Sequence, residues 1–322
     1  MNPYPSPSPQ AAFRGWARLN LFWALSRTPH GLLDMCTPPF AALLWLGGFP
    51  PAAVAGLGLV TAFAGYTAVY ALNDLVDFRL DREKVQQAAG FAGGGADLDG
   101  RIVRHPLAQG LLSFREGLAW TVLWSAVAVA GAFLLNPVCV AIFAGGCLCE
   151  AVYCRLFRVS PWRTLVSGAV KTSGAVAAVF AVDPAPSGAF LLALFAAVFA
   201  WEIGGQNIPN DIADLAEDLR LGARTLPAVL GPERASRLAA AALAAAAGLT
   251  AACFALGRGS LPGAAALLSL AASCYLWAPP ARRLVRRPDR GAALGLFNRA
   301  SLYPPLQLAI AVAAILWNRW AP

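Results

Sequence analysis

The side chains best suited to chemistry form one acidic pattern that occurs twice. Residues 73–81 and 210–218 both read N-D-x-x-D-x-x-x-D, and each copy follows a long apolar stretch. These two segments are called the first and second acidic words below. On one continuous helix of ~3.6 residues per turn, positions four apart drift by only ~40°, so each copy would place its polar side chains on one face. These side chains are Asn73, Asp74, Asp77 and Asp81 in the first copy and Asn210, Asp211, Asp214 and Asp218 in the second.

Two carboxylate faces in one hydrophobic chain repel each other unless cations lie between them. Hard oxygen ligands of this kind suit Mg²⁺ that is held jointly by protein and substrate phosphates. We therefore expect two or more Mg²⁺ ions that bridge a diphosphate. A solvated helix end could explain one copy. However, eight of the 17 acidic residues fall within 74–83 and 211–218, and acidic residues that only cover a solvated surface would not be so concentrated. The expected catalytic carboxylates are Asp74, Asp77, Asp211 and Asp214.

The elements that position these side chains are predicted to be membrane helices. With 58% hydrophobic residues, 13% charged residues and a mean hydropathy of +0.58, the 322-residue chain has too little polar surface to cover a soluble globule. We expect an all-α polytopic membrane protein in which nine transmembrane helices surround a central cavity. Asp34 and Pro38-Pro39 interrupt the first of these segments. The segments long enough to cross ~30 Å of hydrocarbon are 30–48, 52–72, 114–134, 137–154, 164–183, 187–206, 237–256, 261–279 and 297–317.

The placement of basic residues predicts the topology. Most of the 25 Lys and Arg lie in the connections 79–113, 155–163, 207–236 and 280–290, and the connections between these are nearly bare. Under the positive-inside rule, the basic connections and the N-terminus face the cytoplasm, and both acidic words lie on that side. We expect an integral protein of a bacterial inner membrane. The connections 79–113 and 207–236 would form a cytoplasmic cap over the cavity.

The whole chain, 1–322, is predicted to be one membrane domain in contact with the lipid bilayer. Residues 1–12 are expected to be a disordered tail. The stretch 13–27 mixes Trp and Leu with Arg, as does an amphipathic helix at a membrane interface. The glycine-rich loop 88–100 is either a flexible linker or a lid over substrate. The sequence leaves the oligomeric state open.

Several other functions are excluded by composition. The net charge of +8 is explained by topology and diphosphate binding rather than by nucleic acid, because the chain lacks interleaved aromatic and basic residues or a folded basic domain. The seven cysteines show no C-x-x-C spacing and are most simply small hydrophobes. With two histidines in the chain, neither a zinc site nor a haem carrier with paired histidines is expected.

Three ionisable residues, Glu150, Lys171 and Glu202, lie inside apolar segments. Such charges are costly in a bilayer and indicate a function by default. Lys171 follows Arg163 by eight residues, so it would lie ~12 Å deep in its helix and could contact the acceptor or the diphosphate. Alternatively, it pairs with Glu202 or Glu150 or extends toward the cytoplasm.

Further words accompany the acidic ones. Arg104–Gly110 reads R-H-P-L-A-Q-G, Arg224–Pro227 reads R-T-L-P, and Tyr153 is followed closely by Arg155. In this order, the words resemble the UbiA superfamily of intramembrane prenyltransferases, which carry one N-D-x-x-D-x-x-x-D word after the second helix and a second Asp-rich word after the sixth. The inserted His105 departs from the family's R-P-L-x-x-G word.

The resemblance implies Mg²⁺-dependent transfer of a polyprenyl group from a prenyl diphosphate to a lipophilic acceptor, most simply an aromatic quinone precursor. Cleavage of the allylic C–O bond leaves a carbocation and pyrophosphate, so the site needs fixed cations and a dry cavity with aromatic residues such as Tyr70. Topology alone also explains arginines in these loops. The candidate substrate-binding residues are Arg82, Lys84, Arg104, Tyr153, Lys171 and Arg224.

Alternatives to this function remain. The acceptor could instead be a non-aromatic lipid or a tetrapyrrole. In a different class, a membrane transporter could use the acidic clusters as its ion site, although transporters usually place that site near the bilayer midplane. A CDP-alcohol phosphotransferase is disfavoured because its D-G-x-x-A-R signature is absent.

Overall fold

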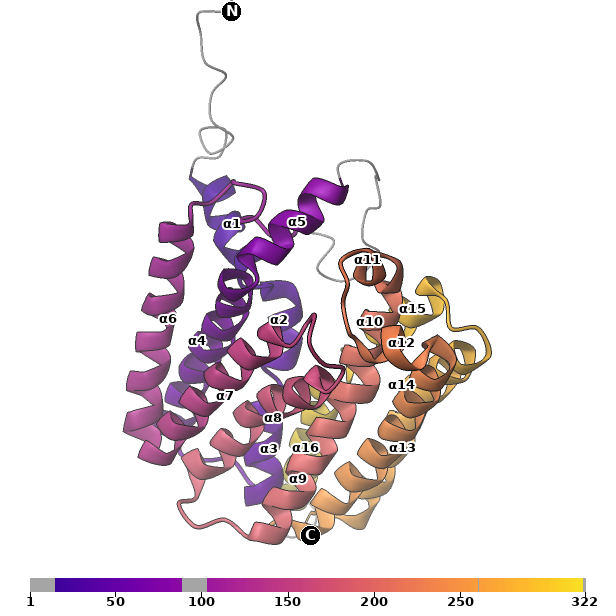
Figure 1. The fold of residues 1–322 in the computed structure, drawn as a ribbon. Helices are drawn as coiled ribbons and strands as arrows, with labels where there is room; N and C mark the ends of the chain where they lie inside the picture. Colours follow the sequence, from indigo (N-terminus) through magenta and orange to yellow (C-terminus); the bar gives the residue numbers. More distant parts are fainter. Residues whose placement is uncertain (1–14, 89–102, 260, 321–322) are drawn as a thin grey trace, which may run out of the picture.

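The protein is a bundle of helices. The computed structural model describes residues 15–88, 103–259 and 261–320, and these residues form no strand (Figure 1). The all-α prediction is therefore confirmed. The elements are α1 Trp16–Leu25, α2 Thr28–Asp34, α3 Thr37–Leu46, α4 Ala52–Val76, α5 Phe78–Ala88, α6 Phe114–Leu135, α7 Pro137–Arg155, α8 Arg163–Val182, α9 Gly188–Trp201, a π turn Glu202–Asn207, α10 Ile208–Ala213, α11 Leu215–Arg220, α12 Leu226–Leu230, α13 Pro232–Leu256, α14 Gly263–Arg286, α15 Arg290–Ala300 and α16 Tyr303–Trp320.

Eight helical segments among the described residues are long and apolar enough to cross a membrane. The first predicted span, 30–48, is not one of them, because it is divided into α2 with seven residues and α3 with ten. The predicted count of nine is therefore not confirmed. The division has a local cause: Pro38 and Pro39 open α3, and a proline disfavours the α conformation in the residue before it.

The helix ends follow local sequence signals. Ser113 begins α6 with a capping box, in which its hydroxyl accepts from the Glu116 N–H and the Glu116 carboxylate accepts from the Ser113 N–H. Asn136 ends α6 and caps α7, accepting from the Val138 N–H, and Pro137 occupies the first helical position. These signals fix a tight turn between two membrane helices.

The acidic words were expected on continuous helices, and this expectation is wrong. The first word bends at Asp77, between α4 and α5, and the second bends at Asp214, between α10 and α11. At these residues ψ is 2° and 5°, whereas an α-helix has about −42°. The helical hydrogen bonds continue across both bends, from Asp81 N–H to Asp77 O and from Asp218 N–H to Asp214 O. Aspartate favours such irregular positions because its side chain competes for backbone hydrogen bonds.

Both bends lie at the same end of the bundle, where α5, α10 and α11 gather (Figure 1). Below them, α4 lies against α6 and α7, α8 lies against α3, α7 and α9, and α13 lies against α9 and α14. The predicted cap connections contain α5, α11 and α12. Their glycine-rich part, and the tail 1–12, lie outside the described residues.

The π turn lies between α9 and α10 and rests directly on α13. A Cβ on Gly204 would lie only 2.5 Å from the Ala239 carbonyl oxygen, so this approach of the two backbones requires glycine. The large apolar core next to it includes Trp201 and Tyr303, which are fully buried. The turn is therefore held rigidly in the bundle.

Candidate active site

The two acidic words line one cavity of about 500 Å³. The cavity begins at the end of the bundle that carries α5 and α11, and α4, α7, α8 and the π turn contribute to its wall. The fold thus brings together two words that are 137 positions apart in the sequence. All eight predicted side chains line it, namely Asn73, Asp74, Asp77, Asp81, Asn210, Asp211, Asp214 and Asp218.

In the first cluster, Asp74 and Asp81 both face His105. The His105 Nδ1 atom lies 3.6 Å from Asp74 Oδ1 and 3.0 Å from Asp81 Oδ2, and one ligand atom from each of the three residues lies within 4.8 Å of the others. Burial opposes protonation of His105, but the two carboxylates raise its pKa overall. Burial also disfavours ionised Asp81, but His105 and Lys84 hold the pKa of Asp81 below its ordinary value.

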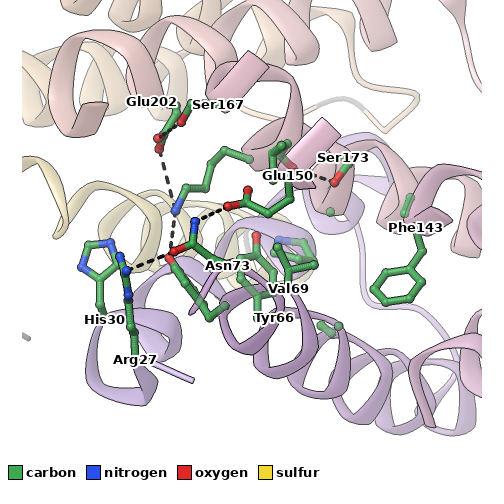
Figure 2. A pocket seen from close by; sticks show the side chains of 18 of the residues that line it. Arg27, His30, Tyr66, Val69, Asn73, Phe143, Glu150, Ser167, Ser173 and Glu202 are labelled. Atoms are coloured by element: carbon green, nitrogen blue, oxygen red, sulfur yellow. Dashed lines mark hydrogen bonds and ion pairs between the residues drawn. The ribbon is translucent and has the colours of Figure 1, made fainter. Parts of the chain in front are cut away.

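Arg27 approaches the same cluster from the beginning of α2. Its Nη2 atom lies 3.4 Å from Asp74 Oδ1 and donates to Asn73 Oδ1 at 3.2 Å (Figure 2). Arg27 and His105 are the two non-glycine residues with positive φ in the described chain, at 46° and 49°. Such backbone conformations cost ~1–3 kcal/mol and concentrate at functional sites. Both strained residues contact Asp74.

The second cluster is centred on Asp211 and faces Arg163. The Arg163 guanidinium is buried, lies 3.9 Å from Asp211 Oδ1 and stacks 4.1 Å from the centre of the Tyr153 ring. Burial raises the pKa of Asp218 to about 6, and the Asp214 charge adds to this effect. Carboxylates with raised pKa values lack sufficient positive charge around them.

The donor atoms fit divalent metal ions. Asp211 Oδ2 is buried and has no hydrogen-bond partner among the described residues. In the first cluster, burial raises the pKa of Asp77, and the charge of Asp81 adds to it. Buried carboxylate oxygens on one cavity wall are the ligands that Mg²⁺ prefers. A cation between the clusters would stabilise both.

The predicted phosphate-binding residues lie in two different environments. Lys84 and Arg104 line the cavity, and Lys84 Nζ is 3.7 Å from Asp81 Oδ1. Arg82 and Arg224 are exposed and are not part of the cavity wall. The Arg224 backbone N–H donates to the Phe157 carbonyl oxygen at 2.8 Å, which anchors its loop beside the site. A role for these two arginines requires their side chains to swing inward.

The three predicted intramembrane charges all line the cavity. Lys171 both faces the cavity and forms the predicted pair with Glu202, with Nζ 3.7 Å from Glu202 Oε2. It also donates to Asp34 and to Tyr70 Oη. The alternative pair with Glu150 is not formed, because that carboxylate accepts from Asn73 Nδ2 instead (Figure 2).

An apolar arm extends the cavity away from the acidic end. The arm runs along α4 toward the beginning of that helix. The later part of α8 and parts of α6 and α7 also line it. Small residues on these helices leave its space open. The arm residues on α4 are Val54, Ala55, Gly58, Leu59, Thr61, Ala62, Gly65 and Val69, and those at the end of α8 are Ala177, Ala178, Ala181 and Val182.

Sequence reasoning missed four polar residues of the site. Arg27 and Arg163 could not be distinguished from arginines that set topology. His105 was noticed only as an insertion in a family word. Asp34 was treated as an interruption of an apolar segment, although a carboxylate at that depth could have been matched with Lys171 as its counter-ion.

Comparisons with known proteins agree with this geometry. The model of the UbiA prenyltransferase family matches residues 36–303. A UbiA homolog from Archaeoglobus fulgidus bound to GPP and Mg²⁺ has a TM-score of 0.66 and 19% identity, over 92% of this chain and 99% of that chain. A UbiA homolog from Aeropyrum pernix K1 has a TM-score of 0.65 and 23% identity, over 87% of this chain and 98% of that chain. A digeranylgeranylglyceryl phosphate synthase structure has a TM-score of 0.66 and 14% identity, over 93% of this chain and 99% of that chain. No curated protein sequence matches.

Proposed function

Because this chain belongs to the UbiA prenyltransferase family, we propose that it transfers a polyprenyl group from its diphosphate to a lipophilic acceptor in a Mg²⁺-dependent reaction. The observation that carries this proposal is one cavity with an acidic end, where both words meet, and an apolar arm along α4. An ionic head with a long hydrocarbon tail matches that division. The homolog from A. fulgidus, which is bound to GPP and Mg²⁺, supports the same donor class.

The residues of the chain have distinct proposed roles. The two acidic clusters would hold Mg²⁺, and the bound ions would supply positive charge to offset the carboxylates and the departing pyrophosphate. Lys84, Arg104 and Arg163 would bind the phosphates directly, because they line the cavity beside the clusters. Arg82 and Arg224 remain candidates that would close over the bound diphosphate.

The hydrocarbon wall protects the reactive end of the donor. The allylic carbon that loses pyrophosphate becomes a carbocation, and water would quench it. The Tyr70 and Tyr153 rings line the cavity next to the clusters and can stabilise positive charge through their faces. The buried Arg163 guanidinium already stacks on Tyr153, so this ring is rigidly oriented.

For the acceptor we propose an aromatic quinone precursor. The second acidic word followed by Gly222–Pro227 resembles the family branches that act on naphthoate, homogentisate, chlorophyllide or glycerol-lipid acceptors more than it resembles the haem branch. A non-aromatic lipid acceptor is the second candidate, since a digeranylgeranylglyceryl phosphate synthase shares the fold. We also propose that the chain is a single domain of a bacterial inner membrane with the acidic end of the cavity at the cytoplasm.

The proposal is tested by pyrophosphate release from geranylgeranyl diphosphate by the purified full chain in the presence of an aromatic acceptor. Release should require Mg²⁺, stop in EDTA and resume when Mg²⁺ is restored. Asp77→Ala and Asp214→Ala should each lower turnover by at least ~10²-fold, comparable to the loss of one electrostatic stabiliser of a transition state. Full activity in chelator, or a folded variant with normal turnover, would contradict the metal role. A transporter would release no pyrophosphate under any of these conditions.

A further inference from the structure

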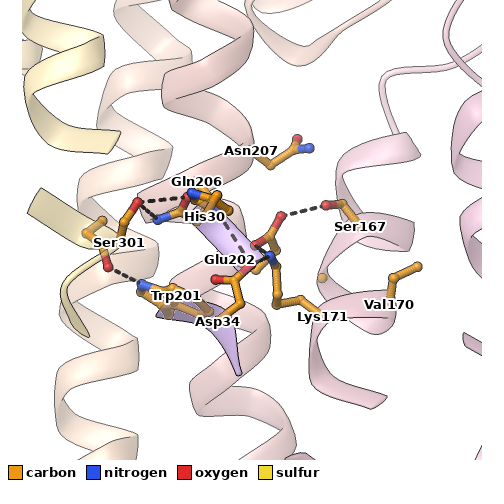
Figure 3. Close-up of polar contacts among 12 residues, drawn as sticks. His30, Asp34, Ser167, Val170, Lys171, Trp201, Glu202, Gln206, Asn207 and Ser301 are labelled. Carbon is orange, nitrogen blue, oxygen red and sulfur yellow. Dashed lines mark hydrogen bonds and ion pairs between the residues drawn. The ribbon is translucent and has the colours of Figure 1, made fainter. Parts of the chain in front are cut away.

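The π turn gives one wall of the cavity an unusual pair of side chains. In a regular α-helix, Glu202 and Asn207 would lie about 140° apart around the axis, since each residue turns ~100°. The π turn has hydrogen bonds from i to i+5 and brings residues five apart onto the same face. Both side chains line the cavity and point toward α8 (Figure 3). π turns within α-helices are frequent at functional sites.

Each of these side chains presents one oxygen that accepts no hydrogen bond from the described residues. Glu202 and Asn207 are both only 6% exposed. Glu202 Oε1 accepts from Ser167 Oγ at 2.7 Å, and Asn207 Nδ2 donates to Tyr153 Oη at 3.2 Å. The other oxygens, Glu202 Oε2 and Asn207 Oδ1, have no hydrogen-bond partner among the described residues. Buried acceptors of this kind are normally paired, so they indicate a ligand that donates hydrogen bonds.

The charges around the pair favour the same kind of ligand. Lys171 is shared between two carboxylates, because it donates to Asp34 and lies 3.7 Å from Glu202 Oε2 (Figure 3). His30 Nε2 lies 3.5 Å from Asp34 Oδ2 and is held on the same group. Lys171 is therefore already shared by two carboxylates. A neutral hydroxyl group suits the Glu202 and Asn207 oxygens better than an anion does.

The pair lies close to the proposed diphosphate site. Asn207 precedes Asp211 by four residues, so the two side chains share a face about one turn, or ~6 Å, apart. Glu202 lies one further turn below Asn207. With the diphosphate at the acidic clusters as proposed, a molecule bound there would lie next to the carbon that carries the diphosphate, on the side away from the clusters.

We propose that Glu202 and Asn207 form the subsite for the acceptor, that the acceptor presents a hydroxyl group to them, and that Glu202 removes its proton. The inference rests on the proposed prenyl transfer. In the reaction, the C1–O bond of the donor breaks and its electron pair leaves with pyrophosphate. An electron pair of the acceptor forms the new bond to C1, and one proton passes from the acceptor to Glu202 Oε2. For attack by a ring carbon, the displaced ring hydrogen returns to the oxygen, so the net loss is still one proton.

The first experiment separates acceptor chemistry from donor binding. Glu202→Gln keeps the side chain's size and removes the base, and Glu233→Gln on the exposed first turn of α13 is the matched control. With Mg²⁺, the Glu202→Gln variant should bind geranylgeranyl diphosphate as tightly as wild type does. Its kcat for transfer to hydroxyl-bearing acceptors should fall by ~10²- to 10⁴-fold. The Glu233→Gln variant should match wild type in both donor binding and kcat.

The second experiment measures binding without turnover. Titration calorimetry on the full chain should show that 1-naphthol binds more tightly than naphthalene. In the Asn207→Leu variant, the ratio of these two affinities should be at least about tenfold smaller than in wild type. Equal affinity of wild type for the two probes would overturn the subsite. Normal transfer by Glu202→Gln, or loss of donor binding in step with transfer, would overturn the proton role. A wild-type chain that releases no pyrophosphate from geranylgeranyl diphosphate in the presence of Mg²⁺ and an acceptor would instead contradict prenyl transfer itself.

Discussion

Replacing Gly65 with phenylalanine tests whether the apolar arm holds the prenyl tail. Gly65 lies in the cavity wall on α4, twelve residues before Asp77, which corresponds to ~18 Å along a helix that rises ~1.5 Å per residue. Three bonds of an extended chain cover ~3.5 Å. An isoprene unit adds four bonds to the chain, so one extended unit covers roughly 5 Å. A tail of four units therefore passes Gly65, whereas a tail of two units ends before it.

The structure also gives the size of the effect. A Cβ at Gly65 would lie 3.7 Å from the Phe143 ring, which is ordinary contact, so the helix can accept a side chain there while an aromatic ring fills the arm. Overpacking costs ~1–3 kcal/mol, or roughly 5- to 150-fold at 1.4 kcal/mol per factor of ten. We expect kcat/KM for geranylgeranyl diphosphate to fall at least ~5-fold relative to that for geranyl diphosphate.

Gly56 provides the matched control. It lies on the same helix, is exposed, has no atom within 4 Å of an added Cβ and does not line the cavity. Gly56→Phe should therefore leave the ratio between the two donors unchanged. The assay is pyrophosphate release at several concentrations of each donor, with both variants at matched purity. An unchanged ratio in Gly65→Phe, or equal shifts in both variants, would show that the tail does not occupy the arm.

Three further predictions follow from the same site. If Arg224 closes over the diphosphate as proposed, Arg224→Ala should raise the KM for prenyl diphosphate or lower kcat, because a charge-assisted phosphate contact would be lost. Arg283→Ala should leave both constants nearly unchanged, and equal effects would assign both arginines to topology. Burial raises the pKa of Asp218 to about 6, so this carboxylate is ionised above that pH, and Mg²⁺ affinity measured by calorimetry should weaken as the pH falls from ~7 to ~5. The Asp218→Asn variant should show a flatter pH dependence. Cysteines introduced at exposed Leu219 and Pro184 should react with impermeant reagents from opposite sides of the membrane, and labelling from one side would contradict the topology.

The sequence was sufficient for the helices and for the general chemistry of the cavity. Hydropathy located eight of the nine predicted spans, because burying backbone polar groups in a bilayer demands helices of a fixed minimum length. The spacing of the acidic words identified side chains that share a wall, although both words bend at their central aspartate. The bends at Asp77 and Asp214 were not predicted because a shift in one ψ angle leaves no mark in the hydrophobic pattern.

The contacts between distant helices were not predictable from spacing. Lys171 and Asp34 are separated by more than one hundred residues, and only the packing of α2 against the bundle brings them together. Arg163 carries the same sequence signal as any arginine at a cytoplasmic helix end. Its burial against Tyr153 and Asp211 distinguishes it, and burial is a property of the packed bundle.

The order of side chains along the α9–α11 segment restricts which atom can attack the donor. In the proposed function, an amphipathic donor would be fixed at both ends, with its head at Asp211 and Asp214 and its tail in the arm beside α4, so its C1 atom would have little freedom. The π turn then supplies Glu202 and Asn207 one to two turns below the head, and Gly204 locks that turn onto α13. A regular helix at this point would rotate one of the two side chains out of the cavity. Under these proposals, the π turn would couple the position of the acceptor to that of the diphosphate through a single rigid segment, and moving either would misalign the new bond.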